Sequence, residues 1–178
     1  MIYFDNAATT RTKPQEVYDA AFEYMREIGV SPGRGSYQLG IEASRMLYRS
    51  RCTVGRFFGL TEPERVIFTK NSTEAINLLF NGLFKSGDHV VVSCFEHNAV
   101  LRPLETLKRH GLIDYSVVPL EDLSLSPEEI YKKYATDETK LIAFTLASNL
   151  TGRGVFREDI FRYFKDKGIN TFVDASQG

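Results

Sequence analysis

Apolar residues recur at helical spacing in two stretches of the first sixty residues. The first stretch has them at Val17, Ala21, Tyr24 and Ile28, a spacing typical of one face of a helix. Thr12-Lys13-Pro14-Gln15 has the spacing of a capping box at its start, and Gly29 can end it. After a loop rich in Gly, Ser and Pro, a second helix is predicted from Leu39 to Phe58. We expect residues 1–60 to form a helical arm.

From Arg65 onward, short apolar runs alternate with helical patterns. The predicted strands are Val66–Phe68, His89–Ser93, Tyr115–Val118, Leu141–Leu146 and Thr171–Val173. One predicted helix follows Asn71, and a second includes Val100–Leu107, where Pro103 should start or bend it. A third helix follows Ser126, and a fourth lies around Asp159–Lys167. Strands that alternate with helices indicate a parallel α/β sheet covered on both faces. We expect residues 61–178 to form this domain.

Composition narrows the classes of function. The chain has 178 residues, with 22 basic and 23 acidic side chains, so it lacks the basic excess expected of a nucleic-acid-binding protein. No apolar run is long enough for a membrane span, and the first residues do not resemble a secretion signal. Its two cysteines are too few for a disulfide framework. We expect a cytoplasmic protein that binds neither nucleic acid nor membrane.

Polar groups follow the predicted strands, where open parallel sheets bind their ligands. Ser72 and Thr73 come after the first strand and open a helix, so their hydroxyls and the helix N–H groups could hold a phosphate. Plain helix capping is the simpler interpretation of this feature alone. Neither a P-loop nor a Gly-x-Gly-x-x-Gly motif is present, which argues against a nucleotide-binding domain.

Three further strand ends carry candidate chemistry. His97 could offer an aromatic face or transfer a proton, although a single histidine there is more often a loop or capping residue. Asn149 lies in a turn and is by itself more typical of an ordinary turn residue. Asp174 ends a buried strand, where a carboxylate needs a cation, a metal or a helix end. Cys94 fits a packed residue better than a nucleophile, and no histidine spacing favours a metal.

Taken together, these segments resemble the class V aminotransferase family, and within it the cysteine desulfurase and selenocysteine lyase branch. The similar segments are Tyr3–Thr10, Ser31–Gly35, Phe68–Asn77, Glu96–Val100, Ser148–Gly152 and Val173–Gln177. They run from one end of the chain to the other. The resemblance implies the α/β fold type I of pyridoxal-phosphate-dependent transferases. This chain would be a partial large domain, with a mainly parallel sheet flanked by helices, plus the N-terminal helical arm.

The resemblance also implies pyridoxal 5′-phosphate as cofactor, whose ring acts as an electron sink. It assigns one role to each matching residue. Ser72 and Thr73 would hold the phosphate, His97 would stack on the ring and assist proton movement, Asn149 and Gln177 would lie at the 3-oxygen, and Asp174 would pair with the pyridine nitrogen. The implied substrate is a small amino acid such as cysteine or selenocysteine, and the implied assembly is a homodimer.

Other family residues have no counterpart among these 178. The Schiff-base lysine follows Asp174 in the family, on a strand that would lie after Gly178, and Lys70 does not match it. The arginine that holds the substrate carboxylate and the mobile cysteine that accepts sulfur are also absent. We therefore expect this chain to be an N-terminal fragment, inactive by itself. The alternatives are another class V aminotransferase or lyase, and a non-catalytic assembly module.

The resemblance has a topological consequence. In the family, two strands with no counterpart here lie between the strand of Val66–Phe68 and the rest of the sheet. Without them, Val66–Phe68 would lack neighbours and two sheet edges would be unpaired. We expect the sheet to close up or to pair with another chain.

Overall fold

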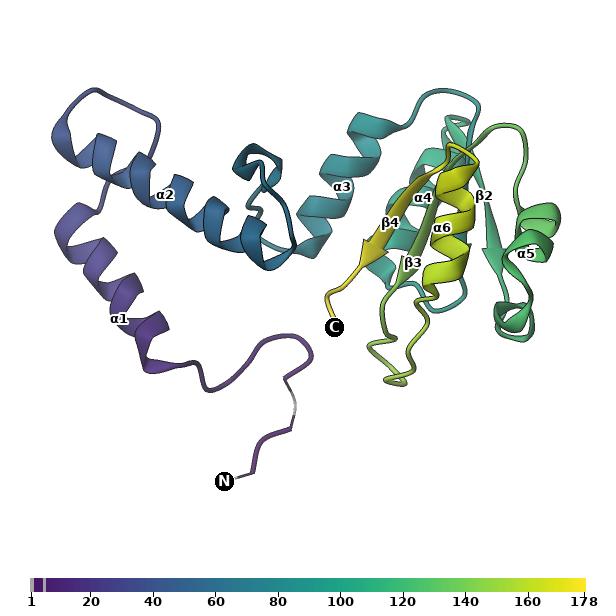
Figure 1. The fold of residues 1–178 in the computed structure, drawn as a ribbon, viewed down its shortest axis with the longest axis horizontal. Helices are drawn as coiled ribbons and strands as arrows, with labels where there is room; N and C mark the ends of the chain where they lie inside the picture. Colours follow the sequence, from purple (N-terminus) through teal and green to yellow (C-terminus); the bar gives the residue numbers. More distant parts are fainter. Residues whose placement is uncertain (1, 5) are drawn as a thin grey trace. The chain divides into compact units, whose positions relative to one another are not determined.

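A computed structural model describes residues 2–4 and 6–178. The chain divides into two compact units, Met1–Phe68 and Thr69–Gly178 (Figure 1). The first is helical, whereas the second contains the sheet and its covering helices.

The first unit contains the two helices expected in the arm. Helix α1 spans Gln15–Glu23, continues as the π-helical turn η1 over Tyr24–Ile28 and ends at Gly29, whose φ of 56° is readily adopted by glycine. Helix α2 spans Gln38–Phe57, within a residue of the prediction. The predicted capping box at Thr12 is wrong, because Pro14 is the N-cap of α1 and no side chain caps the helix. The backbone of Pro14 is itself extended, with φ −51° and ψ 144°, so the helix begins after it.

The predicted strand Val66–Phe68 is also wrong. These residues follow the 3₁₀ turn η2 (Pro63–Arg65) and belong to no strand of the described chain. Val66 is buried and extended, whereas Ile67 is 66% exposed. An apolar run becomes a strand only where a neighbour accepts its backbone hydrogen bonds. Among the described residues the segment lacks a strand neighbour, as expected without the two family strands, and it is not taken into the sheet. Pairing of the sheet with another chain stays a prediction.

The second unit contains a four-stranded parallel sheet in the order β2-β1-β3-β4, which confirms the predicted α/β class. Its strands are β1 (Asp88–Ser93), β2 (Ile113–Val118), β3 (Thr139–Thr145) and β4 (Asn170–Asp174). Its helices are α3 (Ser72–Leu83), α4 (Asn98–Arg109), the short η3 (Leu120–Ser124), α5 (Pro127–Tyr134) and α6 (Glu158–Asp166). The four strands and four longer helices predicted in this unit are therefore confirmed.

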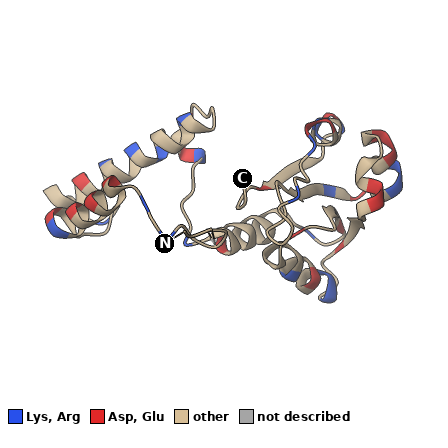
Figure 2. Cartoon of the chain, turned by 90° about the horizontal axis from the view of Figure 1, so that it is seen from below, with Lys and Arg blue, Asp and Glu red and all other residues tan. Residues whose placement is uncertain are grey.

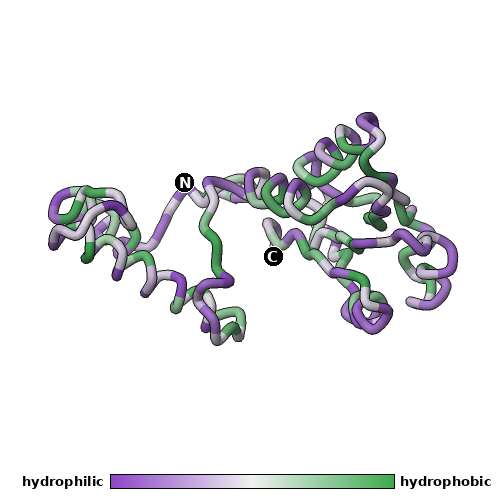
Figure 3. The backbone as a smooth tube through the Cα atoms, turned by 90° about the horizontal axis from the view of Figure 1, so that it is seen from above, coloured by the Kyte–Doolittle hydropathy of each residue, from purple (hydrophilic) through white to green (hydrophobic). Residues whose placement is uncertain are grey.

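Two apolar layers hold this sheet. On one face, Val90 and Val92 of β1 pack with residues of α3 and α4 such as Phe80 and Leu104. On the other face, Val91 packs with α5 and α6. Successive strand residues point to opposite faces, so a strand covered on both sides contains consecutive apolar residues, as β1 does. Figure 3, coloured by hydropathy, shows hydrophobic and hydrophilic stretches following one another along the chain.

Local signals place the helix starts. Asn71 caps α3 by accepting a hydrogen bond from the Glu74 N–H, and Ser126 and Glu129 form a complete capping box at α5, as the sequence predicts. Pro103 lies inside α4, so the prediction that it could start this helix is wrong. Helix α4 begins five residues earlier, where His97 supplies the cap.

Charge is distributed evenly over the molecule. Figure 2 shows acidic and basic residues interspersed along the helices. Several pairs join neighbouring turns of one helix, such as Lys132 with Glu128 and Arg162 with Glu158. No helix in the described part of the chain is long and apolar enough to cross a membrane.

Candidate functional site

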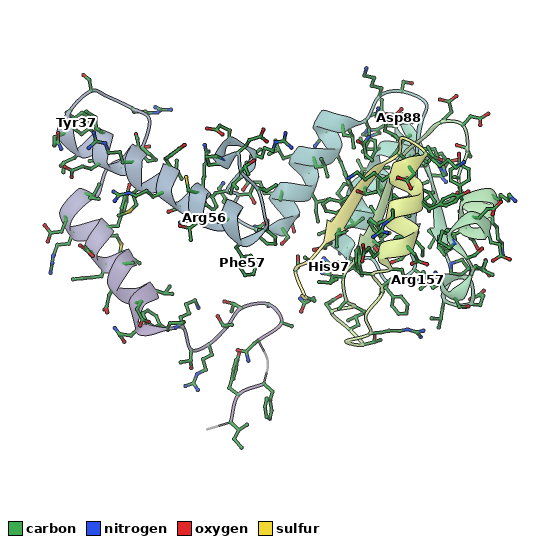
Figure 4. The ribbon with its side chains drawn as sticks, in the orientation of Figure 1. Tyr37, Arg56, Phe57, Asp88, His97 and Arg157 are labelled. Atoms are coloured by element: carbon green, nitrogen blue, oxygen red, sulfur yellow. The ribbon has the colours of Figure 1, made fainter. Side chains whose placement is uncertain are left out.

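The carboxyl ends of the four parallel strands meet at one edge of the sheet. Figure 4 labels Asp88, where β1 begins, and His97, four residues after β1 ends, at opposite ends of this unit. Asp174 ends β4 and lies opposite Thr145, the last residue of β3. The strand-end residues singled out from the sequence therefore lie at a common edge, as expected for a parallel sheet.

A chain of hydroxyl groups links the start of α3 to Asp174. The Ser176 hydroxyl donates to Asp174 Oδ1 at 2.5 Å and lies 2.8 Å from Ser72 Oγ. The Ser176 N–H donates to the same carboxylate oxygen at 3.0 Å. Ser72 and Asp174, which are far apart in the sequence, thus lie within reach of one small ligand.

The first turn of α3 carries two exposed hydroxyl groups, of which that of Ser72 contacts Ser176. Asn71 is the capping residue, since its Oδ1 accepts the Glu74 N–H at 2.9 Å, and the Glu74 carboxylate accepts the Lys70 N–H. The capping interpretation of this motif is therefore confirmed, with Asn71 rather than Ser72 or Thr73 as the capping residue. Ser72 and Thr73 are both exposed in the first turn, where N–H groups lack partners within the helix. These donors are suited to an anion.

His97 caps helix α4 and lines a groove. Its Nδ1 accepts the Ala99 N–H at 3.0 Å, so the neutral ring carries its proton on Nε2. A groove of about 370 Å³ between α3 and α4 is lined by His97, Thr73 and Arg102, among others. The structure thus brings Thr73 and His97 to one groove, and it also confirms that His97 is a capping residue.

Asn149 and Gln177 lie in the segments that follow β3 and β4. Asn149 is exposed in the loop after β3, which the Ala147–Gly154 bridge closes. The Leu146 N–H donates to the Asp174 carbonyl at 2.8 Å, which ties the start of that loop to the end of β4. Gln177 is half-buried three residues after Asp174. Their roles at the 3-oxygen stay predictions.

Cys94 lies in the turn after β1 and is exposed. Desolvation, the largest influence, raises the pKa of its thiol, and a protonated thiol is a poor nucleophile. The interpretation of Cys94 as a packed residue is therefore wrong, because the side chain is exposed, whereas the raised pKa agrees with an unreactive thiol. The described residues contain no cluster of three metal-ligating side chains.

Glu96 was not identified from the sequence as a site residue. It is 7% exposed, and its Oε1 accepts hydrogen bonds from the Ser93 hydroxyl at 2.5 Å and the Thr145 N–H at 2.7 Å. Burial, with a smaller contribution from the nearby Asp174, raises its pKa to about 7 despite these two bonds. Its position beside His97 at a strand end was visible in the sequence, but its burial was not. Ser176 was missed because its contact with Ser72, a residue distant in the sequence, was not visible either.

The raised pKa of Glu96 predicts a pH-dependent stability. Because the folded chain binds this proton more tightly than the unfolded chain, the stabilisation is complete below about pH 4.5 and is lost as the pH rises to about 7. Relative to Glu96→Gln, the wild-type chain should lose about 3 kcal/mol over this interval. Urea unfolding at a series of pH values measures the difference. The exposed Glu138→Gln is the control, and parallel curves for wild type and Glu96→Gln would contradict the prediction.

The residues at this edge fit a phosphorylated cationic ring. Ser72, Thr73 and the helix start offer donors for a phosphate, while Asp174, 7% exposed and held by Ser176, offers a buried negative charge. A buried carboxylate at a strand end is stabilised by a cation, and a protonated pyridine nitrogen is such a cation. His97, which lies between these residues in the sequence, adds the flat aromatic surface of its imidazole ring.

Comparison with known proteins identifies the family of this chain. Residues 2–178 match the family model described as "Aminotransferase class-V". The chain is 35% identical to a probable cysteine desulfurase of Methanothermobacter thermautotrophicus, covering 99% of this chain and 44% of the relative. It is 33% identical to a probable cysteine desulfurase of Pseudomonas aeruginosa, covering 100% of this chain and 45% of the relative. The chain thus spans less than half the length of these curated relatives.

Solved structures share the fold. The apo structure of a cysteine desulfurase from Thermococcus onnurineus superposes with a TM-score of 0.83 at 31% identity, over 98% of this chain and 44% of that one. A structure described as a NifS-like protein superposes with a TM-score of 0.86 at 29% identity, over 99% and 49%. The chain therefore has part of the fold of fold type I pyridoxal-phosphate-dependent enzymes. The chain belongs to the aminotransferase class-V family.

Proposed function

We propose that this chain forms the cofactor-binding part of a pyridoxal-phosphate-dependent cysteine desulfurase. Enzymes of this family use pyridoxal 5′-phosphate, which supplies an electron sink for bonds at the α-carbon of an amino acid. The link from Ser72 through Ser176 to Asp174 is the observation that supports the proposal most strongly. It brings an anion-binding helix start and a buried carboxylate within reach of one small molecule.

Each residue has a defined task in this proposal. Ser72 and Thr73 bind the phosphate, and Asp174 holds the proton on the pyridine nitrogen. His97 packs on the ring and moves a proton through Nε2, because Nδ1 is occupied by the Ala99 N–H. Asn149 and Gln177 bind the 3-oxygen. These two assignments rest on the family resemblance, whereas the others also rest on the contacts described above.

Substrate and assembly are proposed from the relatives. Two of them are named probable cysteine desulfurases, which supports cysteine as substrate. Selenocysteine is the alternative that the family branch suggests. We also propose a homodimer in the cytoplasm, with an arm over residues 1–60 and a cofactor domain over residues 61–178. The 178 residues contain no match to the Schiff-base lysine, so we expect the chain alone to bind the cofactor without turnover.

Cofactor binding by the 178-residue chain tests the proposal. Equilibrium dialysis should show binding of pyridoxal 5′-phosphate, with pyridoxal at least about tenfold weaker because it lacks the anion. Ser72→Ala should weaken binding of the phosphorylated form by about tenfold. The matched control is Ser50→Ala, which changes an exposed hydroxyl of α2. Equal affinity for the two ligands, or an unaltered Ser72→Ala, would favour a non-catalytic module.

A further inference from the structure

Glu96 joins two strand ends, and the proposed cofactor contacts do not use it. Its Oε1 accepts from the Ser93 hydroxyl at the end of β1 and from the backbone N–H of Thr145 at the end of β3. The Ser93 hydroxyl also accepts the Phe95 N–H at 3.2 Å. The turn that carries His97 is therefore fastened to β3 through one buried carboxyl group.

The second oxygen of Glu96 is different. Among the described residues, Oε2 is buried and has no hydrogen-bond partner. A buried carboxylate whose lone pairs lack donors is destabilised, whereas a protonated carboxyl group carries no charge. Burial therefore favours the neutral form, in agreement with the raised pKa of this group.

Asp174 is the neighbouring carboxyl group. Thr145 contacts both residues. Its N–H donates to the Glu96 carboxyl group, and its hydroxyl lies 3.3 Å from the backbone carbonyl oxygen of Asp174. Asp174 Oδ1 accepts two hydrogen bonds from Ser176. The charge of Asp174 raises the pKa of Glu96, because like charges in one buried region repel each other. Cys94 and His97 are further ionisable residues in the segment between β1 and α4.

We propose that Glu96 is a positioning residue: as a neutral acid it fixes the turn of His97 against β3 and leaves the negative charge at this edge to Asp174. The inference rests on the proposed function, since the residues it positions are those assigned to the cofactor. An ionised Glu96 would place a second negative charge beside Asp174. That charge would weaken the packing of the turn and would also repel the phosphate.

Carboxyl and backbone amide signals in NMR spectra of the 178-residue chain test this directly. Glu96 should titrate with a midpoint near 7, and Asp174→Asn should lower that midpoint because it removes a like charge. The amide signal of Thr145, whose N–H donates to Glu96 Oε1, should follow this titration in the wild-type chain. In Glu96→Gln it should lose that step. Glu138→Gln, which changes an exposed acid, should alter neither signal.

Removal of the acceptor gives a second readout. Glu96→Ala should speed amide exchange in the turn before α4 by about tenfold and weaken cofactor binding to a similar extent, while Glu96→Gln stays near wild type.

A Glu96 midpoint in the range of exposed glutamates would overturn the inference. So would amide-exchange rates in the turn before α4 that Glu96→Ala leaves unchanged. If Glu96→Ala does not fold, the wild-type, Glu96→Gln and Asp174→Asn titrations decide. If the wild-type chain does not bind the cofactor, the proposed function is contradicted. The titration and amide-exchange results test the positioning role of Glu96 separately.

Discussion

Replacing Phe80 by alanine is expected to destabilise the sheet unit by about 3–5 kcal/mol, the range for a large aromatic side chain removed from a core. Phe80 is 1% exposed, and its ring centroid lies 5.2 Å from that of Phe84 and 6.1 Å from that of Phe172. It therefore joins α3 to β4, the two elements that carry Ser72 and Asp174. Urea unfolding followed by circular dichroism measures the loss.

The neighbouring leucine of the same helix provides a matched control. Leu78 is 56% exposed, so Leu78→Ala should cost less than about 1 kcal/mol. Similar losses for the two variants would show that Phe80 does not occupy the core. Because a loosened α3 also displaces Ser72, Phe80→Ala should weaken cofactor binding even under conditions where the chain remains folded.

Replacing Asp174 by alanine is expected to lower turnover by at least about a hundredfold, as for the loss of other preorganised charged or polar groups in active sites. Without the carboxylate, the proton on the pyridine nitrogen loses its counter-charge and the electron sink is weakened. The measurement needs an active enzyme built around this chain. One such enzyme is a chimaera in which residues 1–178 replace the matching part of the Methanothermobacter thermautotrophicus relative.

Two controls separate chemistry from folding in this experiment. Asp174→Asn keeps the size and the acceptor oxygen but removes the charge, so it should also be slow while unfolding like the wild type. Asp137→Ala changes an exposed acid in the turn before β3 and should leave turnover unchanged. Full activity of Asp174→Ala would remove this residue from its assigned role.

The predictions from sequence succeeded where the signal is local or periodic. Val90, Val91 and Val92 are consecutive apolar residues, and a strand covered on both faces requires such a run. The Ser126 capping box and the end of the first helical stretch at Gly29 also depend only on neighbouring residues. These features therefore follow from short segments of chain.

They failed where a distant partner decides the outcome. Val66–Phe68 has the composition of a strand, but no strand pairs with it, so its backbone groups form no ladder. The Thr12 motif has the spacing of a capping box, yet the geometry of Pro14 moves the helix start beyond it. The composition of a short segment specifies neither the strand that would pair with it nor the backbone geometry of a proline within it.

The candidate site shows the same division. Chain order and strand periodicity were enough to indicate that the ends of β1, β3 and β4 share an edge, because parallel strands must align in direction. Only the folded chain places the Ser176 hydroxyl between Ser72 and Asp174, and only the folded chain buries Glu96 beside Thr145. Hydrogen bonds between residues distant in sequence, and the loss of water around a carboxyl group, arise from packing in three dimensions, which no local pattern encodes.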